Sequence, residues 1–127
     1  MASQLYPLGK KALLDGSIAM LTDNLKVYGV DTGVETYNSA DQFGNQITSP
    51  VFTSGNLAGK TTTGGVFDAN DITITAITGA TIEALVLFKD TGVAGTSPLI
   101  AWFDISVFTP NGSDGTIVWN ASGIFAI

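Results

Sequence analysis

Short runs of alternating hydrophobic and polar residues cover most of the chain, and this alternation is typical of β-strands with one buried face. The segments Asn24–Asp31 and Asp71–Ala76 alternate in this way. Two other segments, Ile82–Lys89 and Leu99–Val107, are apolar on both faces in their middle. We expect them to form central strands, because a strand that is covered on both sides presents no polar face to water.

The remaining segments are less regular. Residues 44–65 are rich in glycine, threonine and serine, which predicts a long loop with one short strand around Val51–Thr53. Ser39–Phe43 fits one helical turn that is capped by its serine. Thr116–Asn120 and Gly123–Ile127 predict a hairpin at the end of the chain.

The first residues follow a different pattern. Apolar side chains recur with roughly helical spacing over residues 5–13. Pro7 suits the first turn of a helix, where its missing N–H costs nothing, and Gly16 would end the helix. We therefore expect an extended arm through Tyr6, followed by a short helix to Asp15.

Strands separated by glycine, asparagine and aspartate turns, without helices between them, favour an antiparallel β-sandwich or barrel. The sequence thus predicts a mainly β protein with an N-terminal arm and a short helix. Residues 1–16 would form the arm and helix, and residues 17–127 a single β domain. A chain of 127 residues is long enough to enclose one hydrophobic core.

Composition removes much of the usual enzyme chemistry. Histidine, cysteine and arginine are absent, and 5 lysines stand against 11 acidic residues, so the net charge is −6. The missing residue types exclude a Ser-His-Asp triad, a thiolate nucleophile and a metal site built on Cys or His. The negative charge disfavours nucleic acid, and no apolar run approaches the ~20 residues that a membrane helix needs. We expect no enzymatic activity, no cofactor, no metal, no nucleic-acid partner and no membrane contact.

Three candidate motifs have simpler explanations. Gly55–Thr61 is similar to a phosphate-binding loop, but three residues separate its glycines where the motif requires four. Asp68 and Asp71 could ligate calcium, yet acidic turn residues more often hydrogen-bond to their own backbone. Glu35 and Glu83, the only glutamates, could form a glycosidase pair, but nothing in the sequence brings them together.

Aromatic residues offer a further possibility. Four of them could form a platform for sugar rings: Tyr28, Tyr37, Trp102 and Trp119. Trp102 is the most informative, because it faces away from the apolar face of its own strand. Two alternatives remain open for it, burial inside the domain and contact with another subunit, since interface cores favour tryptophan.

Several segments, taken in chain order, carry a resemblance. They are Leu5–Lys10, Leu14–Gly16, Lys26-Val27, Val30–Gly33, Tyr37–Phe43, Leu57–Thr61, Glu83–Gly92, Thr109–Gly112 and Val118-Trp119. Together they resemble a family of small virion proteins that are encoded in the structural gene clusters of tailed phages and prophages. The resemblance extends over most of the chain and brings no catalytic residues with it.

The resemblance implies a non-enzymatic virion structural protein. The role it favours is decoration, or cementing, of the outer capsid surface, with the phage major capsid protein as partner and a homo-oligomer, preferably a trimer, as the active form. The expected interface consists of the arm residues and the outward-facing tryptophan: Leu5, Tyr6, Pro7, Leu8 and Trp102. The arm would add a strand or helix to a neighbouring subunit. A tail-associated component and a carbohydrate-binding β module are the alternatives.

Overall fold

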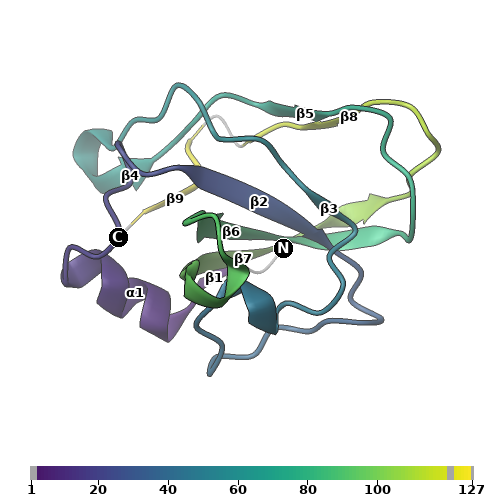
Figure 1. The fold of residues 1–127 in the computed structure, drawn as a ribbon. Helices are drawn as coiled ribbons and strands as arrows, with labels where there is room; N and C mark the ends of the chain where they lie inside the picture. Colours follow the sequence, from purple (N-terminus) through teal and green to yellow (C-terminus); the bar gives the residue numbers. More distant parts are fainter. Residues whose placement is uncertain (1–2, 120–121, 127) are drawn as a thin grey trace.

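Five strands form one antiparallel sheet in the order β1-β7-β6-β2-β3 (Figure 1). The computed structural model describes residues 3–119 and 122–126. The sheet strands are β1 (Ser3–Leu5), β2 (Leu25–Val30), β3 (Phe52–Thr53), β6 (Ile82–Lys89) and β7 (Leu99–Phe108). Two shorter pairs join β4 (Val66–Phe67) to β9 (Phe125–Ala126), and β5 (Ile72–Ile74) to β8 (Gly115–Ile117). The protein is mainly β, as the alternation predicted.

Short helical elements connect these strands. The α-helix α1 runs over Pro7–Leu14, and three single 3-10 turns are η1 (Gly44–Gln46), η2 (Thr63–Gly65) and η3 (Ala94–Thr96). The predicted helix near the N-terminus is confirmed, and proline stands in its first turn. No helix in the described ranges is long and apolar enough to cross a membrane.

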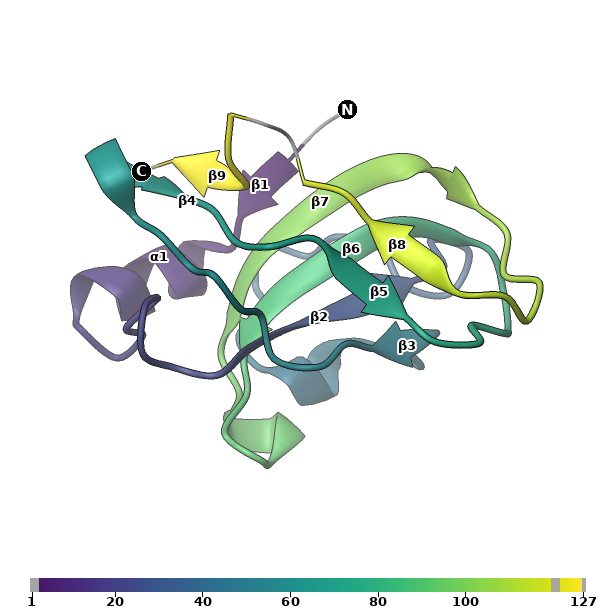
Figure 2. The same ribbon diagram turned by 90° about the horizontal axis from the view of Figure 1, so that it is seen from above.

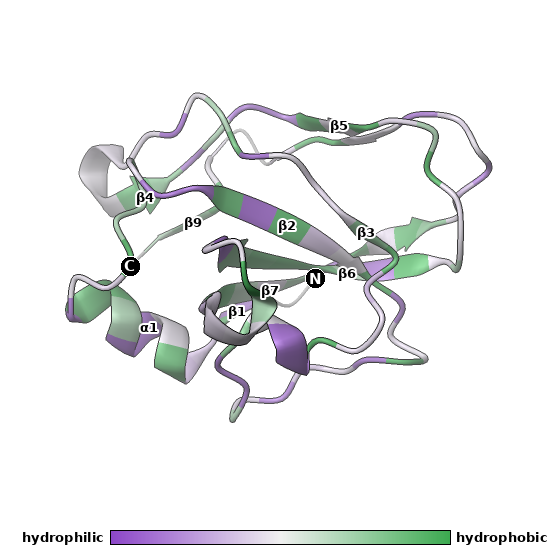
Figure 3. Ribbon diagram, in the orientation of Figure 1, coloured by the Kyte–Doolittle hydropathy of each residue, from purple (hydrophilic) through white to green (hydrophobic). Residues whose placement is uncertain are grey.

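The centre of the sheet matches the two segments that are apolar on both faces. β6 and β7 pair so that Val86 lies opposite Trp102 and Leu85 opposite Phe103. β2 pairs with the other edge of β6, and its positions alternate between hydrophobic and hydrophilic in Figure 3. Nearly all of β6 is buried, because the sheet is covered on both sides.

One side of the sheet, the first face, packs against the two short strand pairs. Figure 2 shows β5 and β8 lying over β6 and β7, with β4 and β9 nearer to α1. The buried cluster on this face joins sheet residues such as Val27, Leu85 and Phe103 to Phe67, and Ile72 packs against it. This arrangement is sandwich-like, with a complete sheet on one side and short ladders on the other.

The opposite side, the second face, is covered mainly by irregular chain. In Figure 1 the segment between β2 and β3 passes beneath the sheet. Its Ile47 joins the buried cluster that includes Tyr28, Val86 and Trp102, and Tyr37 packs against that cluster. The long loop thus serves as the second layer of this part of the core.

The N-terminal arm is the edge strand of the sheet. Leu5 pairs with Ala101 on β7, and the backbone N–H of Tyr6 donates to the carbonyl of Ile100 at 2.9 Å. Gly9 lets α1 lie directly on β7, since a Cβ at this position would clash with the carbonyl oxygen of Leu99. Arm and helix therefore pack against the β domain along β7.

Two local predictions were wrong. The final segments do not form a hairpin with each other: β8 pairs with β5, and β9 pairs with β4. Each of these two short strands pairs with a strand that is distant in sequence, a choice that the local pattern does not encode. The predicted end residues Asn120 and Ile127 lie outside the described residues.

The second wrong prediction is the helical turn at Ser39–Phe43. The single turn lies at Gly44–Gln46 instead. Its position follows from the side chain of Gln46, whose Oε1 accepts hydrogen bonds from the backbone N–H groups of Gln42 and Phe43. The strand predictions at residues 24–31, 71–76, 82–89 and 99–107, and the short strand near residue 52, are confirmed.

Candidate interaction surfaces

The four expected interface residues of the arm differ in accessibility. Tyr6 has 0% of its surface exposed and belongs to the core of the second face. Leu5 and Leu8 are half-buried, and Pro7 is exposed at the start of α1. Tyr6 therefore offers no surface to a partner in this fold, whereas Pro7, Leu5 and Leu8 retain some.

Trp102, the fifth expected interface residue, is only 3% exposed. Its indole N–H donates to Oδ1 of Asp104 at 2.8 Å. The ring of Tyr37 meets it edge-on, with 6.1 Å between ring centroids. Of the two alternatives for this residue, burial inside the domain is the one found, because the segment after β2 covers its side of the sheet.

The same segment contributes two acidic side chains, Glu35 and Asp41, near the buried hydroxyl of Tyr6. The hydroxyl of Tyr6 has no hydrogen-bond partner among the described residues, and burial raises the pKa of this phenol. Burial also raises the pKa of Asp41. It raises the pKa of Glu35 as well, although two hydrogen bonds from Thr48 act in the opposite direction. The environment here favours neutral side chains.

A groove, which we call the arm groove, lies against the arm and is bordered by β7 and β9. It has a volume of about 610 Å³ and is lined by Gln4, Leu5, Pro7, Lys10, Tyr37, Ala101, Phe103, Ile124, Phe125 and Ala126. Two of the expected interface residues, Leu5 and Pro7, thus line one groove. Most of its lining residues are apolar, and Lys10 carries the one charged side chain among the described residues that line it.

Lys10 differs from the other lysines in the described part of the chain. Lys11, Lys26 and Lys89 form ion pairs with aspartates, and Lys60 donates to the carbonyl of Asp23. Lys10 has no such partner among the described residues and is exposed. The arm groove therefore presents an ammonium group that has no ion-pair partner among the described residues, next to apolar side chains.

A second hollow, which we call the apolar cleft, lies between the end of β7 and β8. Its volume is about 390 Å³, and it is lined by Phe52, Ile74, Ile77, Ile82, Leu85, Ile105, Ser106, Val107, Phe108, Gly115, Thr116, Ile117 and Val118. No lining residue is charged. Val107 and Val118 are 68% and 72% exposed. Sequence reasoning missed this cleft, because it depends on the pairing of β8 with β5.

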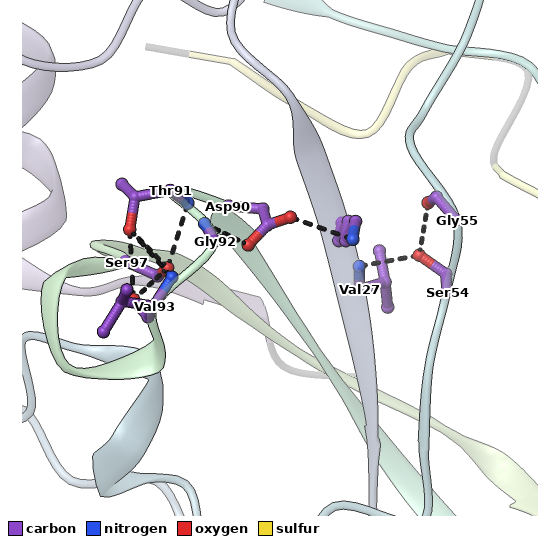
Figure 4. Close-up of polar contacts among 9 residues, drawn as sticks. Val27, Ser54, Gly55, Asp90, Thr91, Gly92, Val93 and Ser97 are labelled. Carbon is purple, nitrogen blue, oxygen red and sulfur yellow. Dashed lines mark hydrogen bonds and ion pairs between the residues drawn. The ribbon is translucent and has the colours of Figure 1, made fainter.

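The loop Gly55–Thr61, which is similar to a phosphate-binding loop, is held along β2 by hydrogen bonds. Ser54, which is buried, accepts from the backbone N–H of Val27 at 2.9 Å and donates to the carbonyl of Gly55 at 2.8 Å (Figure 4). The N–H of Leu57 donates to the carbonyl of Leu25. The loop's polar groups thus hold an extended segment in place, and its lysine is the one bound to Asp23.

The connection between β6 and β7 is held in a similar way. The hydroxyls of Thr91 and Ser97 lie 3.1 Å from one another, and both donate to the carbonyl of Val93 (Figure 4). Asp90 accepts from the N–H of Gly92 and pairs with Lys26. These contacts shape a turn in which the hydroxyls of Thr91 and Ser97 form hydrogen bonds with other groups of the turn.

The two acidic candidates for calcium accept hydrogen bonds from backbone N–H groups, Asp68 from a neighbouring residue and Asp71 from a distant one. Asp68 accepts from the N–H of Ala69, and Asp71 accepts from the N–H of Trp119. Across residues 3–119 and 122–126, no three acidic side chains gather into a group that could hold a metal ion.

The two glutamates have different partners. Glu83 accepts from the N–H and hydroxyl of Thr32 at 2.9 and 3.0 Å. Hydrogen bonds lower the pKa of Glu83, and the one from Thr81 has the largest effect. Burial raises the pKa of Glu35. The structure gives each carboxylate its own set of threonine donors.

The aromatic residues considered as a sugar platform lie in separate places. Tyr28 is buried and stacks on Phe88 with 4.1 Å between ring centroids. Trp119 is half-buried and packs against Phe103 on the first face. Tyr37 and Trp102 meet on the second face.

No known protein-family model matches the chain. No curated protein matches it significantly either.

Proposed function

We propose that this chain is a non-enzymatic virion structural protein that decorates the outer surface of a tailed-phage capsid. The major capsid protein would be its partner. The bound form would be a homo-oligomer, preferably a trimer. Support comes from the family resemblance along the chain. The arm groove supplies the structural observation, since it joins two of the expected interface residues to an uncommitted lysine.

The arm groove suits recognition of an extended segment. In the described part of the chain, β1 pairs with β7 only, so its other edge faces outward. An extended peptide can pair with such an edge while its side chains enter adjacent pockets. Leu5 and Pro7 would bury apolar side chains of the partner, and Lys10 would pair with a carboxylate. Binding of this kind requires shape and charge complementarity and no reactive group.

The first test is the number of copies in purified virions of the source phage. A number comparable to that of the major capsid protein supports decoration. A handful of copies would place the protein in the tail or at a vertex and contradict the decoration role. Absence from the virion would contradict any structural role.

The second test concerns the arm groove itself. Lys10→Ala removes the groove's only charge, and we expect it to weaken binding to capsids that lack this protein by about tenfold, because a charge-assisted contact contributes on the order of 1.4 kcal/mol. Binding is measured by co-sedimentation with capsids. Lys11→Ala is the matched control: it removes the same charge one residue away, from a lysine that pairs with Asp15. Equal binding by both variants would reject the groove.

A further inference from the structure

The proposed capsid contact leaves the apolar cleft unused. We propose that copies of this chain contact one another through it. This inference does not depend on the proposed capsid contact, since the arm groove and the apolar cleft are lined by different residues.

The chemistry of the cleft fits an interface core. Nearly every lining side chain is aliphatic or aromatic, and the only lining hydroxyls are those of Ser106 and Thr116. Both of these residues are exposed, so neither is held inside to orient a small molecule. Small-ligand pockets use a few fixed polar groups for that purpose. A protein surface that excludes water needs none at its centre.

The shape of the cleft allows it to meet a copy of itself. Val107 and Val118 line the hollow and are also highly exposed. One patch therefore carries both a concave floor and projecting β-branched side chains. A patch with both features can be self-complementary, because the projections of one copy enter the hollow of the next.

Charge allows a second copy to bind at this surface although the chain is acidic. The chain carries a net charge of −6, so two copies repel each other wherever acidic surfaces meet. The thirteen residues that line the cleft include no charged side chain. This surface lets identical acidic chains approach without juxtaposing like charges. A basic partner would instead be recognised through carboxylates, which the cleft lacks.

Strand edges at the cleft add backbone groups to the contact. Among the described residues, β8 pairs with β5 only, and the end of β7 pairs with β6 only. Both strands line the cleft. A neighbouring copy can therefore complete hydrogen bonds at these edges as it buries the valines.

Sedimentation equilibrium of the purified protein, followed up to about 1 mM, tests the proposal, since weaker association would contribute little to assembly. We expect a reversible dimer, because a patch that binds to itself is complete after two copies. Val107→Lys and Val118→Lys should each weaken association at least tenfold, because each places an unpaired charge in the contact. The matched control is Val93→Lys: that valine is 62% exposed, lies before η3, and its replacement changes the charge equally.

The outcomes separate this proposal from the proposed function. A wild-type protein that stays monomeric throughout, or cleft variants that associate as the wild type does, would overturn the cleft as the contact. A larger oligomer that the cleft variants disrupt would still support the surface and would show that it meets a different patch on the next copy. If a lysine variant does not fold, as judged by circular dichroism, Val107→Thr and Val118→Thr keep the shape and add only a hydroxyl. Capsid binding that fails while self-association persists contradicts the decoration role alone.

Discussion

Asp41 shows how the fold changes the chemistry of a single residue. This carboxyl group is only 8% exposed and lies over the second face of the sheet. Among the described residues it forms no ion pair, and burial raises its pKa. A buried carboxylate without a cation is penalised in its charged form. Ionisation at neutral pH therefore lowers the stability of the segment that covers the second face.

The variant Asp41→Asn tests this penalty. The folded pKa lies above the ordinary 3.8, so the penalty is present at neutral pH and is relieved as pH falls through the folded value. We expect the variant to be more stable than the wild type at about pH 7 and the difference to shrink toward about pH 4. Urea unfolding at both pH values measures it.

Asp23 supplies a control of opposite sign. A hydrogen bond from the N–H of Ala19, followed by interaction with Lys89, lowers its pKa. Its ionised form therefore stabilises the fold above the ordinary pKa, and this contribution is lost as pH falls through the lowered value. Asp23→Asn should be less stable than the wild type at neutral pH. The same shift in both variants would show that charge removal alone, and not local burial, sets the sign.

At the scale of elements, the contact between α1 and β7 makes the arm part of the fold. Tyr6 enters the core of the second face, and Gly9 allows the helix to touch the strand backbone. Removal of residues 1–8 would therefore open the core as well as abolish the arm groove. Point substitutions such as Lys10→Ala separate these two effects.

Gly9→Ala tests the close approach of the helix. The added methyl group would clash with the backbone of β7, so the helix must move outward. We expect a loss of about 1–3 kcal/mol in unfolding free energy, the usual range for overpacking, measured by urea denaturation. Gly55→Ala is the control, because no atom lies near the position of its added Cβ. If Gly9→Ala left the unfolding free energy unchanged, α1 would not rest on β7.

At the scale of the whole molecule, net charge opposes self-association. Copies with a charge of −6 repel one another over distances comparable to the Debye length, about 10 Å at 0.1 M salt. Contact through an uncharged cleft should therefore strengthen as salt screens this repulsion.

Sedimentation equilibrium at about 0.05 M and about 0.5 M sodium chloride measures this effect. We expect tighter association at the higher concentration, because the apolar contact is retained while the repulsion is screened. The Val93→Lys control should respond in the same direction. Association that weakens with salt would instead indicate that ion pairs hold the copies together.

Alternation and composition by themselves determined the strands, the short helix and the mainly β class. These features depend on local physics: the two-residue period of strands, and the restrictions that proline and glycine impose. The predicted run Ile82–Lys89 coincides with β6 for this reason. The same local information indicated that Trp102 faces away from Ala101 and Phe103, which is confirmed. It also placed Leu99 with those two residues, and this was wrong: Leu99 joins the cluster of Trp102, where the pairing of β7 with β6 shifts in register between Leu87 and Phe88.

Only the tertiary structure decided what covers each face. Trp102 is buried because a long loop, weakly patterned in sequence, passes under the sheet, and β8 pairs with β5 across a distance that the local pattern does not record. Both candidate surfaces depend on such pairings: β1 on β7 forms the arm groove, and β8 beside β7 forms the apolar cleft. Periodicity specifies which side of a strand is apolar, whereas long-range packing selects the partner that covers it.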